Sequence, residues 1–317
     1  MDSPVADTNR APIWTLEQQS EELTRRWDIV SWTNKGEVRF LPRATDIIVS
    51  TTPKSGTTWL VYICHQLRTG GAEPDFEEFD KVVTFLEVPL SVNGAPVDLE
   101  AVVHPAEPRI FYSHVSYESL PKGGKIIHCV RDPKDVFYSL LTYLDTLLLL
   151  KGRVSTSVFF DLMQNRCQYT ADSLKDLLRW WEHRSDKDVF FVFFDDLKED
   201  HALWVRRIAE FIGVSCNEQT LARVVRNTTH AEMAKHQSRF VDHSIIAECA
   251  KMFGDDPPSE PIGRVRKDGG KLGDGQKLPI EMQELIDTAW HDIITTKLGF
   301  RDYKEMREAW MREGNTY

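Results

Sequence analysis

The chain contains 317 residues, of which 41% are hydrophobic and 28% are charged, enough for one large α/β domain or two smaller ones. This composition excludes a disordered chain, a collagen and a small disulfide-stabilised scaffold. Because the formal net charge of −10 repels nucleic acids and anionic lipids, we expect a protein that binds neither nucleic acid nor membrane.

The first predicted elements are a strand, a turn and a helix. Residues 1–20 show no regular pattern, and we expect them to form an irregular extension before one domain over residues 21–317. The apolar run 46–50 predicts a buried strand, and the Pro and Gly of 51–56 predict a turn. A helix is predicted over 57–67, directly after this turn.

Two further strands are predicted, and each is followed by a helix. The strand at 125–130 precedes a helix from 134 to about 150, and the strand at 189–194 precedes a helix over about 202–212. Buried strands that alternate with helices predict an α/β fold, here a single domain with a mostly parallel central sheet flanked by helices. The Pro- and Gly-rich segment 254–279 predicts a mobile, basic loop that suits an anionic ligand.

The cysteines and the apolar segments indicate the cellular compartment of the protein. The five cysteines are odd in number, widely spaced and without a CxxC pair, which disfavours a disulfide framework and a zinc site. The longest apolar stretch, 136–150, is shorter than the roughly 20 residues that span a bilayer. Since the N-terminus shows no basic segment followed by an apolar one, we expect a cytoplasmic protein.

The segment TTPKSGTTW at 51–59 gives the strongest indication of function. It lies between a buried strand and a helix, where free backbone N–H groups and the helix dipole attract an anion. Gly56 permits close approach of a ligand, and Lys54 adds a positive charge. Thr57 and Thr58 add hydroxyl donors. A plain helix cap is the alternative, but caps rarely combine these residues after a buried strand. We therefore predict a P-loop-like phosphate-binding loop.

Two more basic segments favour the same kind of ligand. Arg131 and Ser139 flank Pro133 at the start of the helix after the second strand, and a turn there brings both toward one anionic group. A capped helix with a surface Arg is the alternative. The late segment 264–273 is basic and Gly-rich; taken alone, such a run is more often a solvated loop.

Together the three segments resemble those of the cytosolic sulfotransferases that use 3′-phosphoadenosine 5′-phosphosulfate (PAPS), in order and spacing, over roughly residues 40–280. The resemblance implies PAPS as the sulfuryl donor, no metal, and a Trp59 that stacks on the adenine. Phe194 stands where the family usually has a Tyr that touches the adenine. The implied cofactor-binding residues are Lys54, Ser55, Gly56, Thr57, Thr58, Trp59, Arg131, Ser139, Phe194, Thr228, Arg266, Lys267 and Gly269.

Transfer of a sulfuryl group to a hydroxyl or amine requires a base, and histidine titrates in the right range. His114 ends a short β-like run, which places it at the sheet edge where open α/β sheets bind ligands. The family's catalytic His has the same spacing to a Leu-Pro pair, here Leu120 and Pro121. Lys54 is placed to neutralise the leaving group, adenosine 3′,5′-bisphosphate (PAP). By the resemblance, Ser139 holds Lys54 aside until the acceptor arrives.

The resemblance also implies an acceptor-binding surface made of Phe85, Val88 and Tyr143. This lining suits a small hydrophobic alcohol or phenol, while an amine or a larger natural product stays open. The expected partner is therefore a small-molecule acceptor. The chain departs from the family at Tyr112, where a Lys is common. The family's dimer motif KxxxTVxxxE is not recognisable after Lys277, so monomer and homodimer both stay open.

Two other functions fit part of the sequence. A non-catalytic PAP-binding protein would account for Tyr112 and for the altered late loop. A P-loop kinase would account for an apolar strand that ends near Asp195 and Asp196, but the usual Lys-Ser/Thr pair does not follow the loop glycine. The presence of both Lys54 and His114 favours sulfuryl transfer.

Overall fold

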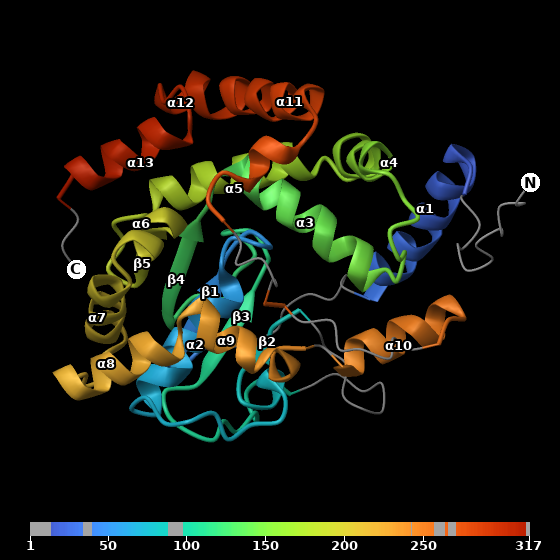
Figure 1. The fold of residues 1–317 in the computed structure, drawn as a ribbon. Helices are drawn as coiled ribbons and strands as arrows, with labels where there is room; N and C mark the ends of the chain where they lie inside the picture. Colours follow the sequence, from blue (N-terminus) through green and yellow to red (C-terminus); the bar gives the residue numbers. More distant parts are fainter. Residues whose placement is uncertain are drawn as a thin grey trace, which may run out of the picture.

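The structure is a computed structural model that describes residues 14–33, 40–87, 98–241, 243–256, 264–265 and 271–314, without the side chains of 31–33, 244 and 245. Over these residues the centre is a parallel sheet with the strand order β2-β3-β1-β4-β5 (Figure 1). The strands are β1 (Ile47–Ser50), β2 (Thr84–Phe85), β3 (Ile110–Ser113), β4 (Lys125–Val130) and β5 (Val189–Phe193). The helices are α1 (Leu16–Thr33), α2 (Thr57–Arg68), α3 (Pro133–Leu147), α4 (Thr156–Asp161), α5 (Tyr169–Glu182), α6 (Phe194–Glu199), α7 (His201–Ile212), α8 (Glu218–Asn227), α9 (His230–Lys235), α10 (His243–Phe253), α11 (Ile280–Trp290), α12 (Thr296–Leu298) and α13 (Tyr303–Arg312). Short 3₁₀ or π segments are η1 (Phe79–Lys81), η2 (Leu162–Arg166), η3 (Gln237–Arg239), η4 (Asp274–Lys277) and η5 (His291–Thr295).

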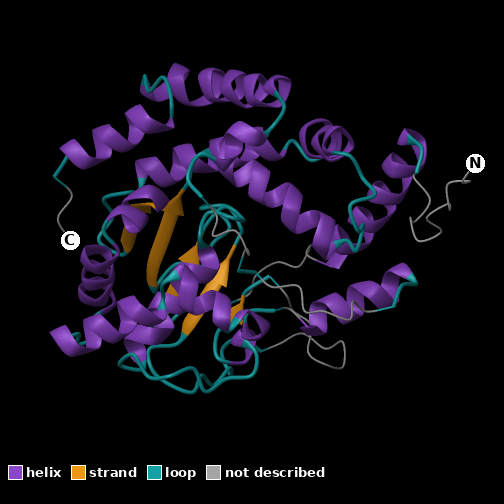
Figure 2. Ribbon diagram, viewed as in Figure 1, coloured by secondary structure: helices purple, strands orange, loops and turns teal. Residues whose placement is uncertain are grey.

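Helices cover both faces of the sheet, and this confirms the predicted α/β class (Figure 2). Ile47 and Val49 of β1 pack in one apolar cluster with α2, α7 and α8. Ile48, between them, packs in a second cluster with α5, α11 and α13. Because both faces are buried, the strands are continuous apolar runs, and this is why β1, β4 and β5 could be predicted. The two residues of β2 are too few to show a period.

A third apolar cluster lies beside the sheet and joins α1, α3, α4, α10 and α11. The helix α1 begins at Leu16, so the part of the expected irregular extension from 16 to 20 is helical, and residues 1–13 lie outside the described part. A capping box explains this start, because the Thr15 hydroxyl accepts from the Gln18 backbone N–H at 3.2 Å and Gln18 Oε1 accepts from the Thr15 N–H at 2.9 Å. Within the described ranges, no helix is both long and apolar enough to cross a bilayer.

The pairing of β1 determines what surrounds its C-terminal end. Ser50 pairs with Ser113 of β3, and Val49 pairs with Ile127 of β4. β4 then continues to Val130. Since all strands run in the same direction, the segments that follow β1, β3 and β4 leave the sheet at one edge, where open α/β sheets bind their ligands.

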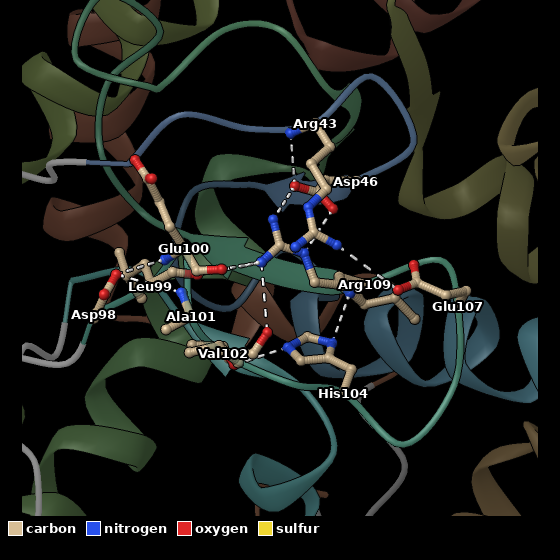
Figure 3. Close-up of polar contacts among 12 residues, drawn as sticks. Arg43, Asp46, Asp98, Leu99, Glu100, Ala101, Val102, His104, Glu107 and Arg109 are labelled. Carbon is tan, nitrogen blue, oxygen red and sulfur yellow. Dashed lines mark hydrogen bonds and ion pairs between the residues drawn. The ribbon is translucent and has the colours of Figure 1, made fainter.

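A buried ion pair stabilises the opposite edge of the sheet, where β1 and β3 begin (Figure 3). Asp46, just before β1, accepts hydrogen bonds from Arg109 Nε at 2.9 Å and from Arg109 Nη2 at 2.6 Å. Arg109 Nη1 also donates to the Glu100 carbonyl at 3.1 Å, and Asp46 also accepts from the Arg43 backbone N–H at 2.8 Å. The pair therefore ties the start of β1 to the start of β3.

We predict that Arg109→Met lowers the free energy of unfolding by about 3 to 5 kcal/mol, because Asp46 is then buried without its partner. Urea unfolding followed by circular dichroism measures the loss. The double variant Asp46→Leu with Arg109→Met should recover most of it, since no charge then remains buried. A loss below about 1 kcal/mol in the single variant would show that the pair does not fasten this edge.

Candidate active site

The turn after β1 leads into a helix N-terminus that suits an anion. Gly56 is the N-cap of α2 with a φ of 102°, a left-handed conformation that favours glycine. A Cβ on Gly56 would lie 2.9 Å from the ring of Phe194. The hydroxyl oxygens of Thr51 and Thr57 are 2.5 Å apart and fix the base of the turn. Since no side chain among the described residues caps α2, its first backbone N–H groups are available to ligand oxygens.

Lys54 lies at the top of this turn and reaches the helix α3. Its φ of 73° is unusual for a residue with a side chain, and such strain is concentrated at functional sites. Lys54 Nζ lies 4.0 Å from the ring centroid of Tyr143, a cation–π distance. Ser139, one turn earlier on α3, is buried. The structure thus brings Tyr143 against Lys54, with Ser139 on the same helix.

Arg131, directly after β4, connects the turn after β1 to α3. Its Nη1 donates to the Lys54 carbonyl at 3.2 Å, and its Nη2 donates to the Asp135 carboxylate at 3.4 Å. Arg131 Nε is buried and has no hydrogen-bond partner among the described residues. An unsatisfied buried donor costs about 1 to 3 kcal/mol, so an anion at this position would stabilise the guanidinium. The prediction of an anion-binding Arg131 fits this geometry.

The end of the late Gly-rich segment is docked on α3, which corrects the expectation of a mobile loop for residues 271–279. Asp135 accepts hydrogen bonds from the backbone N–H of Gly273 at 3.1 Å and of Gly275 at 2.7 Å. A Cβ on Gly275 would lie 2.5 Å from the backbone carbon of Lys134, so only glycine fits. The remaining predicted cofactor residues of this segment lie outside the described residues; they are Arg266, Lys267 and Gly269.

An aromatic group lies beside the turn. The ring centroid of Trp59 is 5.6 Å from that of Phe194 and 5.1 Å from that of His201. Trp59 Nε1 donates to the Thr228 carbonyl at 2.7 Å, and the Thr228 hydroxyl lies 3.0 Å from His201 Nε2. The Arg131 guanidinium lies 4.5 Å from the Phe194 ring centroid. The structure gathers the predicted Trp59, Phe194 and Thr228 and adds His201, for which the sequence carries no signal.

His114 follows β3 and contacts the turn from the side opposite Arg131. Its Nδ1 lies 2.8 Å from the Thr51 carbonyl oxygen, which can only accept, so Nδ1 carries the proton and Nε2 the lone pair. Removal from water lowers the pKa of His114 to about 4; the bond to Thr51 opposes this shift, and the charges of Lys54 and Arg264 add to it. The ring is therefore neutral at pH 7 and able to accept a proton at Nε2.

Glu87 supports His114 and was not predicted. It lies two residues after β2, and its carboxyl accepts a hydrogen bond from the His114 backbone N–H. Burial raises the pKa of Glu87 to about 7, although bonds from His114 and Ser113 lower it. Glu87 Oε2 is buried without a hydrogen-bond partner in the described part of the chain. The only signal in the sequence is an acidic residue directly after the apolar run 82–86.

Two aromatic rings lie beside His114. Phe85 and Tyr112 stack with centroids 4.7 Å apart and 14° between their planes, and the Phe85 ring centroid is 5.5 Å from that of His114. The Tyr112 hydroxyl donates to Asp80 at 2.8 Å. Phe85 of the predicted acceptor surface lies beside His114, whereas Val88 lies outside the described residues.

The site concentrates positive charge in an acidic chain. Lys54, Arg131 and Arg264 join the positive end of α2 at this edge of the sheet, although the formal net charge of the chain is −10. Asp135 and Asp80 pair with Arg131 and Arg264, and the N-terminus of α2 adds a positive partial charge that attracts an anion. In the portion of the chain that the structure describes, no group of three or more His, Cys, Asp or Glu side chains is arranged to hold a metal ion.

Comparisons with known proteins agree with this geometry. A family model described as “Sulfotransferase domain” matches residues 44–250. Sulfotransferase 1A1 of Bos taurus is 29% identical over 218 residues, which cover 64% of this chain and 73% of the relative. The amine sulfotransferase of Oryctolagus cuniculus is 28% identical over 263 residues, which cover 79% of this chain and 81% of the relative.

Two solved structures have a similar fold. A retinol dehydratase in complex with retinol and PAP gives a TM-score of 0.62 at 19% identity, over 81% of this chain and 83% of that chain. A mouse sulfotransferase, SULT7A1, complexed with PAP gives a TM-score of 0.54 at 22% identity, over 86% of this chain and 89% of that chain. At these identities the likeness establishes the fold.

We predict that Glu87→Gln stabilises the protein more at pH 8 than at pH 5, by about 2 kcal/mol. The pKa of Glu87 is raised in the folded state, so its contribution to stability is present below its unfolded pKa of about 4.5 and is lost as the pH rises through about 7. A neutral Gln removes this loss. Thermal unfolding across this pH range measures the difference, with the exposed Glu17→Gln as the control. An equal effect at both pH values would contradict the raised pKa.

Proposed function

The chain belongs to the sulfotransferase family of PAPS-dependent transferases, as its sequence predicts, and on this premise we propose that it transfers the sulfuryl group of PAPS to a hydroxyl or amine of a small hydrophobic acceptor, with His114 as the base. One observation carries the proposal: Lys54, the uncapped N-terminus of α2 and the neutral His114 converge on one turn. One relative is named as an amine sulfotransferase and one similar structure holds retinol, so amines and hydrophobic alcohols are both acceptor classes to test.

We assign each part of the nucleotide to the group that its chemistry suits. The backbone N–H groups at the start of α2 and Lys54 would hold the 5′-phosphosulfate, because no side chain of the described residues caps this helix. Arg131, whose Nε lacks a partner among the described residues, would bind the 3′-phosphate. Trp59 and Phe194 would contact the adenine with their rings. The other residues implied to bind the nucleotide stay predictions; they are Ser55, Gly56, Thr57, Thr58, Ser139, Thr228, Arg266, Lys267 and Gly269.

PAPS supplies the sulfuryl group, and the chain supplies a base, a cation and an orientation. His114 Nε2 removes the proton of the acceptor as the acceptor oxygen or nitrogen forms its bond to sulfur. The bond from sulfur to the bridging oxygen breaks at the same time, in line, and its electron pair stays on the phosphate of PAP. Lys54 neutralises this developing charge. Thr51 holds the His114 ring in the tautomer that the step requires.

We propose a second role for Tyr143, in addition to contact with the acceptor. In the structure the Lys54 ammonium rests on the face of the Tyr143 ring, an interaction worth about 0.5 to 2 kcal/mol. We propose that an acceptor that packs against Tyr143 weakens this contact and lets Lys54 reach the bridging oxygen. Ser139, one turn earlier on α3, would share the holding of Lys54. Donor activation would then depend on the presence of the acceptor.

Two further expectations stay proposals. We propose a cytoplasmic location, which the five cysteines support because all lie among the described residues and are thiols. We propose one domain over 21–317, which is supported by α11 and α13 packing in the same apolar cluster as the sheet.

We predict that the metal-free protein transfers ³⁵S from labelled PAPS to at least one member of a panel of phenols, alcohols and amines. His114→Ala should lower turnover by about 100-fold or more while PAP affinity, measured by calorimetry, stays within about twofold. The exposed His291→Ala is the matched control. Unchanged turnover in His114→Ala would remove this residue from the mechanism, and turnover of ATP with magnesium in place of PAPS would favour a kinase.

A further inference from the structure

A cation from a distant segment lies beside Tyr112, the position at which the family commonly has a Lys. Arg264 is 152 residues away in the chain, yet its Nη2 donates to the Tyr112 hydroxyl oxygen at 3.0 Å. The same nitrogen donates to Asp80 at 2.6 Å. The guanidinium carbon lies 5.4 Å from the ring centroid of Tyr112. Arg264 therefore lies against both the ring and the hydroxyl of Tyr112.

The position of Arg264 is fixed from two directions. Its side chain is only 11% exposed, whereas Asp80 is 31% exposed, so the ion pair is held at the edge of the core rather than in solvent. Its backbone N–H donates to the carbonyl of Phe240, a core residue, at 2.9 Å. A guanidinium does not lose its proton in proteins, so this charge is permanent.

Tyr112 lies between Arg264 and His114 in a chain of contacts. The Tyr112 ring centroid is 6.5 Å from that of His114, and Arg264 and Lys54 are the cations whose charges lower the pKa of His114. The Glu87 carboxyl contacts the backbone N–H of His114 instead of the ring. The two cations whose charges affect His114 come from different elements, Lys54 from the turn after β1 and Arg264 from the segment after α10.

We propose that Arg264 supplies the second cation of the transfer site, and that Asp80 and Tyr112 position it for the sulfonate oxygens of PAPS. The proposal rests on the proposed function, because it assumes that the sulfonate lies between the α2 turn and His114. Five N–H donors in a rigid fork allow an Arg to bind a carboxylate and a sulfonate oxygen together. Tyr112 is then a positioning residue that holds Arg264, which explains how the site functions without a Lys at this position.

Calorimetric titration with PAPS and, separately, with PAP tests this role, because only PAPS carries the sulfonate. We expect Arg264→Gln to weaken PAPS binding by about tenfold and to change PAP binding by less than about twofold. Arg264→Lys, which keeps the charge, should retain most of the PAPS affinity. Tyr112→Phe should lose about threefold for PAPS alone, because Asp80 still holds Arg264. The exposed Arg179→Gln is the control.

The two nucleotides separate the possible outcomes. Equal losses for PAPS and PAP, or no loss for either, in Arg264→Gln would overturn the role of Arg264 and leave it as an anchor of the late segment. Retained PAPS affinity in Arg264→Lys, with unchanged thermal stability in both variants, would exclude misfolding as the cause of a selective loss. A wild-type protein that binds neither nucleotide would overturn the proposed function together with this inference.

Discussion

The parallel pairing of β1 with β3 on one side and β4 on the other is the constraint from which the site follows. Ser50 and Ser113 lie side by side in the sheet, so the turn after β1 and His114 leave the sheet together. β4 runs past the end of its pairing with β1, which carries Arg131 to the other flank of the turn. The outer strands complete the arrangement, since β2 brings Phe85 to His114 and the end of β5 brings Phe194 to Arg131.

Three carboxyl groups hold the functional groups that the strands bring together. Asp135 contacts Arg131 and the late segment, Asp80 contacts Arg264, and Glu87 contacts the backbone of His114. A buried or half-buried carboxylate with a charged or N–H partner fixes direction more strictly than apolar packing does. Part of the acidic excess of the chain is therefore used to hold Arg131, Arg264 and the backbone of His114 in place.

The sequence predicts the parts of this site whose residues are adjacent in the chain. The turn at 51–59 and the helices after β1 and β4 follow from local composition, and His114 follows from its place after an apolar run. The supporting carboxyl groups could not be predicted, because the separation in the chain is 184 residues for the contact of Asp80 with Arg264 and 140 residues for that of Asp135 with Gly275. The docking of residues 271–279 on α3 was not predicted for the same reason. A Gly-rich composition predicts mobility, and only the tertiary contact shows that the absence of a Cβ at Gly275 permits close packing.

A crystal structure of the protein with PAP tests the central claim most directly. The account predicts the 5′-phosphate on the backbone N–H groups at the start of α2, the 3′-phosphate within hydrogen-bond distance of Arg131, and the adenine against Trp59 and Phe194. In that arrangement His114 Nε2 would face the side of the 5′-phosphate from which the acceptor must enter. A nucleotide bound in the reverse direction, or away from the turn after β1, would contradict it.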